Sequence, residues 1–568
     1  MAALINALDT HTSSQFGENG HIEYGWSNDI QERIVQFSFQ LVRTDAVGIT
    51  RLQNTLSTML TLLSTISPTE KAMAKKHLTV LYKLIGQTRD IVEGKGEYYL
   101  SYMMIYVWYK FFPELAKFAL KCFVDIPSSH QYGSWKDMKY FCKYCKEKDG
   151  MDHPLIDYSV KLLNARLKLD SLVTVDTELS LVSKWIPREK TEFAWLFELL
   201  SRDYFPEYLV SVTTTNNNKE VQAILKCKMN YRKLVSGLNK RLDTVQIKQC
   251  GLDWTSIDFN KVTSVSLSKQ KKAFLNIKKN GEVRFPLSED RNSCAKHFSD
   301  RIKKAASNEG LEMKGARVSM ESFTTQAINL ILSPSSIEVD LLNSQWRNNS
   351  AQTGALGKMI AMVDVSGSMK GDPMNVAIAL GIRIAEKSIL GKRMLTFHSV
   401  PTWVNLDPYP TFVSQVETVV KAPWGMNTNF QAALDLILSA CVSKSLTPIE
   451  VEDMVLVILS DMQMDAGDSC DKMALYDTMK ANYGVHGYKP PHILFWNLRS
   501  TRGFPTLSSQ PNTSMMSGFS PALLNLFCEE GMSGLSSCTP WSLLVKSLEN
   551  KRYDVLENWF DVTMDTRS

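Results

Sequence analysis

Long hydrophobic stretches are missing from this sequence. The longest apolar run, 98–109, falls short of the ~20 residues that span a bilayer and contains five tyrosines. Residues 1–15 are polar and lack the basic start and apolar core of a secretory signal. We therefore expect no membrane contact and a cytoplasmic protein, or a virion-associated one if the source is viral. The run 98–109 is interpreted as a buried helix.

Cysteine is also scarce, with 10 residues in a chain of 568. The cysteines lie far apart, so the sequence provides no disulfide framework and reduced thiols are expected. Cys142 and Cys145 form one CxxC pair with His130 and His153 nearby, which leaves a zinc site open. Because no second pair accompanies this CxxC, we favour a packed helix over 138–144.

Net charge is small, at +5, but it is distributed unevenly. Residues 356–568 contain 17 Lys+Arg and 21 Asp+Glu, a net charge of −4, which leaves +9 for residues 1–355. The densest basic run is 261–284, with Lys269, Lys271, Lys272, Lys278 and Lys279. Charge by itself favours a solvated face over a nucleic-acid surface by a small margin.

Chain length predicts at least two folding units, because 568 residues exceed what one hydrophobic core holds. Apolar residues recur at helical spacing through much of the first half, for example in 34–41, 73–84, 155–167 and 231–247. We predict a polar N-terminal tail over 1–27 and a mainly helical domain over 28–350, with a possible subdivision near 205. The polar segment 348–357 is the expected linker to the last domain.

The hydrophobic pattern changes at Lys358. Short continuous apolar runs, typical of strands buried on both faces of a parallel sheet, occur at 359–363, 394–397, 455–459 and 493–496. Helical patterns alternate with them, at 374–389, 430–441 and 472–479. This alternation predicts a doubly wound α/β domain over 356–568, with a parallel-dominated sheet covered by helices on both faces.

Oxygen-bearing side chains follow two of the predicted strands and precede one predicted helix. The first strand leads into Asp364, Ser366 and Ser368, the third leads into Asp461, and Thr428 stands just before a helix. Ligands of open parallel sheets bind beyond the carboxyl ends of the strands, so we expect these side chains to converge. Their oxygens suit Mg²⁺, with Mn²⁺ or Ca²⁺ as alternatives, and disfavour zinc or copper.

These segments resemble the metal-ion-dependent adhesion site (MIDAS) of von Willebrand factor A domains. The matching pieces are 364–369, with the pattern Asp-x-Ser-Gly-Ser, then 425–428 and 459–461, in the order of that family. One departure is Asn429, where that family commonly has Asp, so a nearby negative charge is missing.

The resemblance implies a role for each matching residue. Ser366, Ser368 and Thr428 would bind the metal directly or nearly so, while Asp364 and Asp461 would support it through water. An acidic group of a protein partner would complete the coordination. The C-terminal domain is therefore expected to be a von Willebrand A-type, metal-binding docking domain.

Other segments resemble motifs of the DUF2828 family, namely 88–97, 132–137, 184–190 and 231–233, with Trp254 and Asp258. That family occurs in plants, fungi and large DNA viruses, and its layout is similar to the Ro/TROVE ribonucleoproteins. Those proteins join an RNA-binding helical-repeat ring to a C-terminal von Willebrand A domain. The resemblance covers the chain from near residue 30 to its end and implies a HEAT-like helical part. One departure is Val92-Glu93, where the motifs of that family lead us to expect a more basic sequence.

We therefore predict a non-enzymatic scaffold, RNA-binding or ribonucleoprotein-like, whose α/β domain docks a protein partner. Structured RNA would contact basic residues of the helical part, namely Arg89, Lys95, Lys136, Lys271, Lys272, Lys278 and Lys279. Tyr132 and Trp135 are candidates for base stacking, although a tryptophan at helical spacing is more often a core residue.

Two alternatives stay open. A protein–protein adhesion scaffold, or a virion-associated structural protein without RNA, needs only the metal site. A metal-dependent hydrolase would use Asp364 as its nucleophile, but Ser366 stands where a second carboxylate would act as acid and base. We therefore expect no catalytic residues.

Overall fold

The structure is a computed structural model of residues 1–568. It describes the whole chain apart from residues 1–13, 18, 19, 21, 66–70, 128, 211–216, 308–310, 398, 399, 424–428, 464–474, 529–531 and 566–568.

Helices dominate the first part of the chain, which confirms the prediction of a helical N-terminal part. They are α2 (Ile30–Gln40), α3 (Ala46–Ser64), α4 (Lys71–Arg89), α5 (Tyr99–Phe111), α6 (Pro113–Cys122), α7 (Lys136–Asp149), α8 (Pro154–Leu172), η2 (Asp176–Glu178), α9 (Val182–Trp185), α10 (Ala194–Tyr204) and α11 (Glu207–Val210). The apolar run 98–109 forms α5, and each of its residues from 100 to 108 is buried.

A second group of helices leads to the sheet. It comprises α12 (Asn217–Arg241), α13 (Val245–Cys250), α14 (Ser264–Phe274), α15 (Glu289–Ala306), α16 (Met320–Leu332) and α17 (Ser336–Ser350). Ser288 caps α15 by accepting a hydrogen bond from the Arg291 N–H, as serine does at helix N-termini. Phe274 and Phe298 pack in a small core of their own between α14 and α15.

Among the described residues, six strands form one mixed sheet in the order β5-β4-β3-β6-β7-β8. The strands are β3 (Met359–Asp364), β4 (Arg393–Phe397), β5 (Thr402–Asn405), β6 (Val455–Ser460), β7 (His492–Asn497) and β8 (Thr513–Ser517). Neighbouring strands are parallel except β4 and β5, which are antiparallel. The predicted parallel-dominated sheet is confirmed, and β5 and β8 are additional edge strands.

Alternate residues of the central strands enter two different hydrophobic cores, because successive side chains of a strand point to opposite faces. Ile360 and Met362 of β3 belong to one core, and Ala361 and Val363 belong to the other. Helices cover both faces of the sheet. The helices of this part of the chain are α18 (Asp372–Lys387), α19 (Phe412–Lys421), α20 (Phe430–Ser443), α21 (Pro448–Glu452), α22 (Leu475–Val485), α23 (Pro540–Leu548) and α24 (Asp554–Asp565), the last of which lies away from the sheet.

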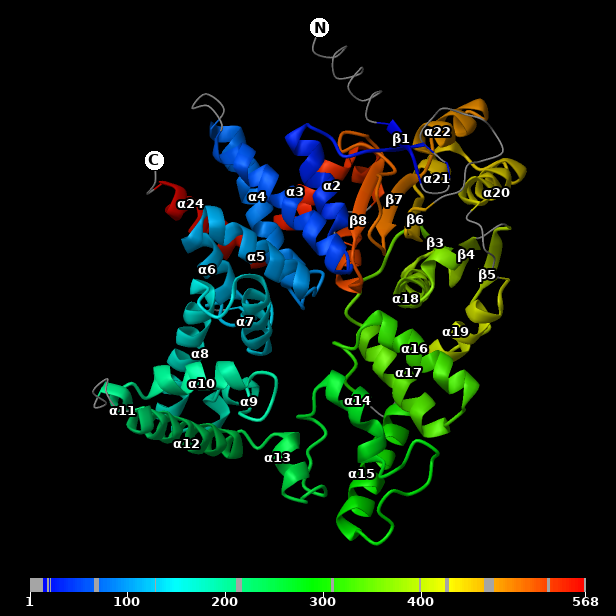
Figure 1. The fold of residues 1–568 in the computed structure, drawn as a ribbon. Coiled ribbons are helices and arrows are strands. Elements are labelled where there is room, and N and C mark those ends of the chain that lie inside the picture. Colours follow the sequence, from blue (N-terminus) through cyan, green and yellow to red (C-terminus); the bar gives the residue numbers. More distant parts are fainter. Residues whose placement is uncertain are drawn as a thin grey trace.

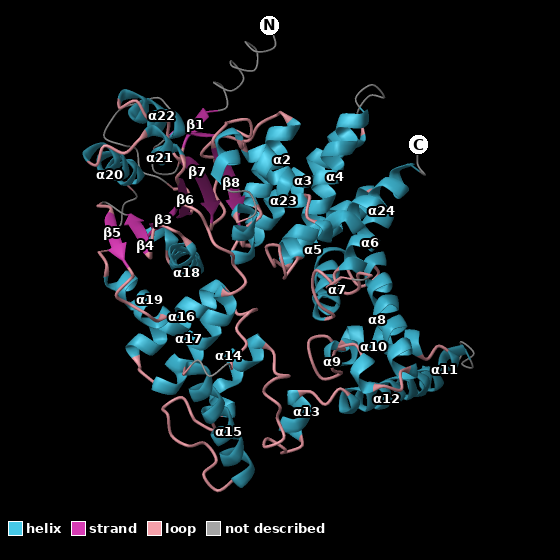
Figure 2. Cartoon of the chain, turned by 180° about the vertical axis from the view of Figure 1, so that it is seen from behind, coloured by secondary structure: helices cyan, strands magenta, loops and turns pink. Residues whose placement is uncertain are grey.

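The chain runs in a circuit that begins and ends at the sheet. Figure 1 shows α2 beside β8, a descent through α5 to α12, and a return through α14 to α17. Figure 2 shows the same arrangement from behind, with α7 and α9 across the centre of the molecule from α14. The two groups of helices therefore form the two sides of the molecule below the sheet.

Contacts cross the predicted boundaries at 27 and 350–356. In the tail, β1 (Ser14–Phe16) pairs with β2 (Ile22–Tyr24), and Tyr24 exchanges backbone hydrogen bonds with Phe504. Helices α16 and α17 contact α19, and α16 also contacts α18. At the other end, α24 lies against α4 and α6, where Trp559 stacks on Phe118 with ring centroids 4.6 Å apart. The helical and α/β parts therefore share cores.

None of the helices in the described part of the chain is both long and apolar enough to cross a membrane.

Candidate functional site

Two adjacent parallel strands bring the predicted metal-binding segments together. Val363 of β3 is paired with Leu459 of β6, so the two strands end at the same edge of the sheet. Asp364 ends β3, and Asp461 directly follows β6. Both aspartates are completely buried. The sheet topology therefore places the two carboxylates side by side, as the sequence predicts.

Hydrogen bonds fix the carboxylate of Asp364 in place. The backbone N–H of Ser366 donates to Asp364 Oδ1 at 2.9 Å, and the hydroxyl of Ser460 donates to Oδ2 at 2.6 Å. The hydroxyl oxygens of Ser366 and Ser368 lie 3.1 Å apart. Gly367 between them is exposed, so the hydroxyl pair lies close to solvent while Asp364 lies beneath it.

Asp461 has one satisfied and one unsatisfied oxygen. Its Oδ1 accepts a hydrogen bond from the Gln463 N–H at 3.3 Å. Its Oδ2 is buried and has no hydrogen-bond partner among the described residues. A buried carboxylate oxygen left without a partner is costly, so this atom marks a place where a cation or water fits.

The electrostatics of the site favour a bound cation. Burial, followed by the charge of Asp461, raises the pKa of Asp364 to about 7. Burial also raises the pKa of Asp461, although the Ser368 hydroxyl, the Gln463 N–H and nearby Arg499 lower it. A divalent cation would neutralise both carboxylates and remove their mutual repulsion.

The donor set fits a hard divalent cation. Ser366 and Ser368 offer hydroxyl oxygens, and Asp364 and Asp461 offer carboxylate oxygens directly or through water. No group of three or more His, Cys, Asp or Glu side chains suited to a metal occurs in the described ranges. Among the described residues, the oxygens brought together here are the two serine hydroxyls and the two carboxylates.

The third predicted segment lies outside the described residues. Thr428, together with Gly425, Met426 and Asn427, belongs to it, so its position relative to Asp364 stays a prediction. The described Asn429 caps α20, because its side chain accepts a hydrogen bond from the Ala432 N–H at 2.9 Å. The departure from Asp at this position therefore still provides a helix cap.

Two neighbours of the site were not assigned a role from the sequence. Ser460 orients Asp364, and its position as the last residue of β6, directly before Asp461, was the available signal. Arg499 follows the next strand, β7, and its exposed guanidinium donates to the backbone oxygen of Ser368. Sheet topology alone places a residue that follows the adjacent parallel strand, such as Arg499, near the same edge of the sheet.

Two residues predicted to contact RNA, Arg89 and Lys95, are buried in the folded chain. Arg89 is 1% exposed, and its Nε and Nη2 donate to both carboxylate oxygens of Asp137 at 2.8 Å. Lys95 is also buried, and its ammonium donates to Ser38 O, Leu41 O and Ser517 Oγ. Both cations bind internal oxygens instead of facing solvent.

The other predicted RNA-binding lysines lie in different environments. Lys136 is half-buried beneath aromatic rings, whereas Lys271 forms an ion pair of 3.0 Å with the buried Glu338. Lys272 approaches the backbone oxygen of Lys279 at 3.4 Å. Lys278 is exposed and paired with Glu282, and Lys279 is exposed. Of these five lysines, Lys278 and Lys279 are exposed and the other three are partly buried.

The candidate stacking residues and the CxxC pair are core residues. Tyr132 is 0% exposed and Trp135 is 8% exposed, so neither ring is available to a base. Cys142 and Cys145 are buried on α7, and burial raises the pKa of Cys142 to about 12. The helix predicted over 138–144 is confirmed within α7.

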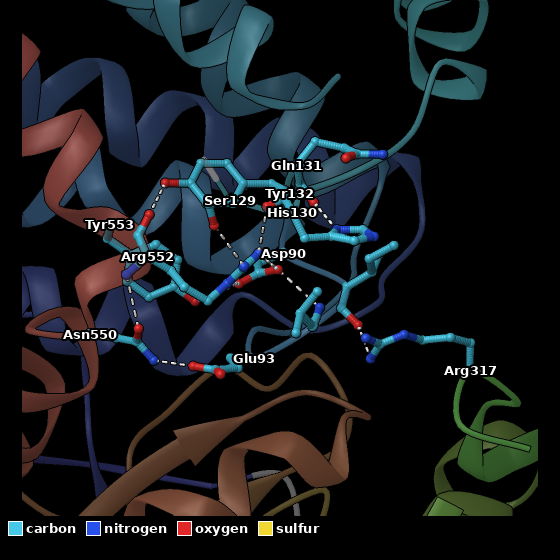
Figure 3. A network of polar contacts seen from close by, with 12 residues as sticks. Asp90, Glu93, Ser129, His130, Gln131, Tyr132, Arg317, Asn550, Arg552 and Tyr553 are labelled. Atoms are coloured by element: carbon cyan, nitrogen blue, oxygen red, sulfur yellow. Dashed lines mark hydrogen bonds and ion pairs between the residues drawn. The ribbon is translucent and has the colours of Figure 1, made fainter. Parts of the chain in front are cut away.

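The 88–97 segment connects the helical part to the C-terminus (Figure 3). Asp90 accepts two hydrogen bonds of 2.7 Å from Arg552, which lies between α23 and α24. Glu93 accepts one from Asn550, and the backbone oxygen of Ile91 accepts one from Arg317 at 2.8 Å. This segment therefore joins three regions that are distant in sequence, and Asp90 and Glu93 make it acidic.

The fold and site define an α/β unit with an oxygen-rich edge, joined through shared cores to a helical part. Residues 358–551 match a family model described as a domain of unknown function, DUF7788. An uncharacterized protein of Acanthamoeba polyphaga mimivirus is 26% identical over 491 residues, which cover 83% of this chain and 79% of that protein. The second similarity is too long to be confined to the α/β unit and extends into the helical part.

Proposed function

We propose that this protein is a non-enzymatic scaffold whose C-terminal part is a von Willebrand A-type domain that holds Mg²⁺, Mn²⁺ or Ca²⁺. The observation that carries the proposal is the buried, unpartnered Oδ2 of Asp461 beside Asp364 and the two serine hydroxyls. Thr428 would complete the set from the loop before α20. The bound ion would present an open position to an acidic group of a protein partner.

Docking is favoured over catalysis by the groups around the site. A hydrolase that uses Asp364 as nucleophile needs a neighbouring acid and base, and the described neighbours are Ser366, Ser368 and Ser460. Asp364 is also fully buried and accepts two hydrogen bonds, which hold it away from an attacking position. The described residues of the site can bind and orient an ion, and among them only the aspartates could carry a proton at neutral pH.

The proposal is tested by calorimetric titration of Mg²⁺ and Mn²⁺ into the full chain. Asp364→Ala should abolish binding, whereas Asp461→Ala should weaken it by ~10–100-fold if Asp461 acts through water. Asp435→Ala, which removes an exposed carboxylate from α20, is the matched control and should bind as the wild type does. Unchanged affinity in Asp364→Ala would reject the site, and a phosphatase activity lost in that variant would revive the hydrolase.

The second component of the proposal is RNA binding by the helical part, in a layout similar to DUF2828 and Ro/TROVE proteins. It is supported by the +9 charge of residues 1–355 and by Lys136, which lies among aromatic rings without an ion-pair partner in the described chain. Purification under mild salt followed by RNA sequencing tests it. Recovery of proteins alone would favour an adhesion scaffold or, as the relative is a mimivirus protein, a virion-associated structural role.

A further inference from the structure

One face of α7 carries a row of lysines. Lys136, Lys139, Lys143 and Lys146 are spaced by three, four and three residues, which places them on the same side of a helix. The opposite side of α7 is buried through Met138, Phe141, Cys142 and Cys145. Each of the four lysines is partly exposed. We call these lysines, with the aromatic rings around them, the α7 surface.

Aromatic rings from four segments surround these lysines. The ammonium of Lys136 lies 5.6, 5.1 and 6.0 Å from the ring centroids of Tyr98, Tyr140 and Trp185. Further rings are approached by Lys139 and Lys146, at 5.4 Å from Trp185 and 4.6 Å from Trp195. Tyr98 is 39% exposed, and Tyr140, Trp185 and Trp195 are partly exposed. The rings are thus held by the fold while part of each face or edge remains accessible.

The positive charge of this surface is only partly compensated. Within the described residues, Lys136, Lys139 and Lys184 make no ion pair, whereas Lys143 contacts Glu192 at 2.6 Å and Glu147 at 3.9 Å. Burial lowers the pKa of Lys136, and the charge of Lys269 lowers it further. Burial and the charge of Lys136 lower the pKa of Lys139 in the same direction. Neighbouring cations that repel one another favour an anionic ligand.

The surface continues across the centre of the molecule. Lys269 of α14 acts on Lys136 of α7, although the two helices lie on opposite sides of the molecule in Figures 1 and 2. Tyr98 and Lys269 also line a cavity of about 790 Å³, which Arg317 borders as well. Cations and rings therefore extend from α7 to the wall of this cavity, which Glu93, Glu97 and Glu321 also line.

Two ligand classes carry repeated negative charge, namely acidic polypeptides and nucleic acids. An acidic polypeptide would use the lysines but would leave the exposed ring faces without a partner. An unpaired nucleic acid uses both, because phosphates bind lysines and splayed bases stack on tyrosine and tryptophan. A base-paired duplex keeps its bases stacked on each other and cannot use the rings.

We infer that the α7 surface binds single-stranded nucleic acid, with Lys136, Lys139 and Lys269 on phosphates and Trp185 stacked on a base. This inference rests on the proposed RNA-binding function. It keeps Lys136 from the residues that the sequence indicated and replaces the others by Lys139, Lys269 and Trp185. The 2′-hydroxyl has no assigned partner, so RNA and DNA of equal length are expected to bind similarly.

The test is fluorescence anisotropy with the full chain and a labelled oligouridine of about 20 nucleotides, a length that spans more than one typical site. Lys136→Gln with Lys139→Gln should weaken binding about tenfold and lower the slope of log affinity against log salt by about 1.4. Trp185→Leu should weaken binding roughly tenfold without changing that slope, and Trp185→Phe should retain most of it. Lys278→Gln with Lys279→Gln is the charge-matched control and should leave affinity unchanged.

Thermal unfolding of each variant checks that the α7 variants remain folded. Binding that is equal in wild type and in the Lys136/Lys139 double variant would overturn the site and leave RNA binding elsewhere on the protein. No binding of oligouridine or its DNA equivalent at low salt would overturn both the site and the RNA component of the function. Equal competition by polyglutamate, together with no effect of Trp185→Leu, would assign the surface to an acidic polypeptide instead.

Discussion

At the scale of single residues, the convergence of the proposed metal-binding side chains was more predictable than the burial of the proposed RNA contacts. Asp364, Ser366 and Ser368 are close in sequence, and Asp461 follows a recognisable strand, so local patterns and sheet topology together place them. The sequence around Arg89 does not reveal its ion-pair partner, because Asp137 lies 48 residues away. A buried arginine and an exposed one look alike in a sequence, since only the tertiary fold supplies the counter-charge.

The first residue-scale prediction concerns Asp364. Its folded-state pKa is raised above the ordinary value to about 7, so the folded state binds more protons than the unfolded chain between about pH 4 and 7. Stability of the metal-free protein is therefore lost as pH rises through this window, by up to about 1.4 kcal/mol per pH unit. Asp364→Asn should lack this loss and be more stable than the wild type at pH 8 without metal.

Added metal should narrow that difference. Mg²⁺ at about 100 times its dissociation constant should stabilise the wild type by ~2.7 kcal/mol and leave Asp364→Asn unchanged. The measurement is chemical denaturation at pH 5 and pH 8, with Mg²⁺ or with a chelator. A wild type that loses no stability relative to the variant between these pH values would show that Asp364 is not the destabilising carboxylate.

The second residue-scale prediction concerns Lys95, which connects the end of α2 to β8. Burial lowers its pKa to about 7, so the unfolded chain binds one more proton than the folded chain between pH 7 and the ordinary lysine value. Wild-type stability should therefore rise with pH from 7 to 10, by about 1.4 kcal/mol per unit, relative to Lys95→Met. Ser517 still donates to Ser38 O and Leu41 O in that variant, so these carbonyls keep a partner.

The charged groups near Lys95 also affect its pKa. Glu97 is the charged residue that raises the Lys95 pKa, and Glu97 itself is paired with Arg43 at 3.1 Å. Thermal unfolding at pH 7, 8.5 and 10 of wild type, Lys95→Met and the exposed control Lys76→Met gives the result. Parallel profiles for wild type and Lys95→Met would mean that Lys95 carries the same charge in the folded and the unfolded chain over this pH range.

At the scale of elements, continuous apolar runs predicted the four central strands but not the edge strands β5 and β8. The segment 402–405 is short and alternates in burial, and 513–517 contains three hydroxyl residues, so neither has the continuous apolar run used to recognise strands. Both become strands because a neighbour in the sheet supplies hydrogen bonds and cover. Their sequences carry little of this information.

The element-scale prediction is that Arg552 holds α24 and the 88–97 segment together. Asp90 is completely buried, so Arg552→Gln leaves a buried carboxylate without its bidentate partner, at a cost of about 3–5 kcal/mol. Hydrogen exchange should become faster in α24 and in 88–97. Lys551→Gln, at the exposed neighbouring position, is the control and should exchange as the wild type does.

A second substitution separates charge from packing. Asp90→Asn combined with Arg552→Gln should recover much of the lost stability, because the uncompensated buried charge is gone. If the double variant loses as much stability as the two single variants lose together, the two residues act through independent contacts. The ion pair would then not be what holds α24 and the 88–97 segment together.

At the scale of the whole molecule, the sequence predicted separate domains and the structure shows shared cores. The hydrophobic core around α4 and α5 continues through α23 to the sheet residues Ile360, Ile458 and Phe495. Composition and periodicity locate the change from helical to α/β pattern at Lys358, because that change is local. They do not show that α24 returns to α4, because the contact joins residues more than 450 positions apart.

The prediction that follows is that residues 356–568 do not form an independent folding unit. Expressed alone, this fragment would expose the apolar faces of α23 and α24, including Leu544, Leu556 and Phe560, all buried in the intact chain. Co-expression with residues 1–350 should restore a soluble complex, since Lys83–Glu557, Asp90–Arg552 and Phe118–Trp559 contacts can form between the two pieces. Size-exclusion chromatography and tandem-tag purification are the measurements.

A fragment 356–548, which lacks α24 and Arg552, is the matched control and should copurify much less, because each of those three contacts is absent. A fragment 356–568 that is monomeric and unfolds cooperatively at the temperature of the intact chain would establish an independent domain and show that the shared core contributes little to stability.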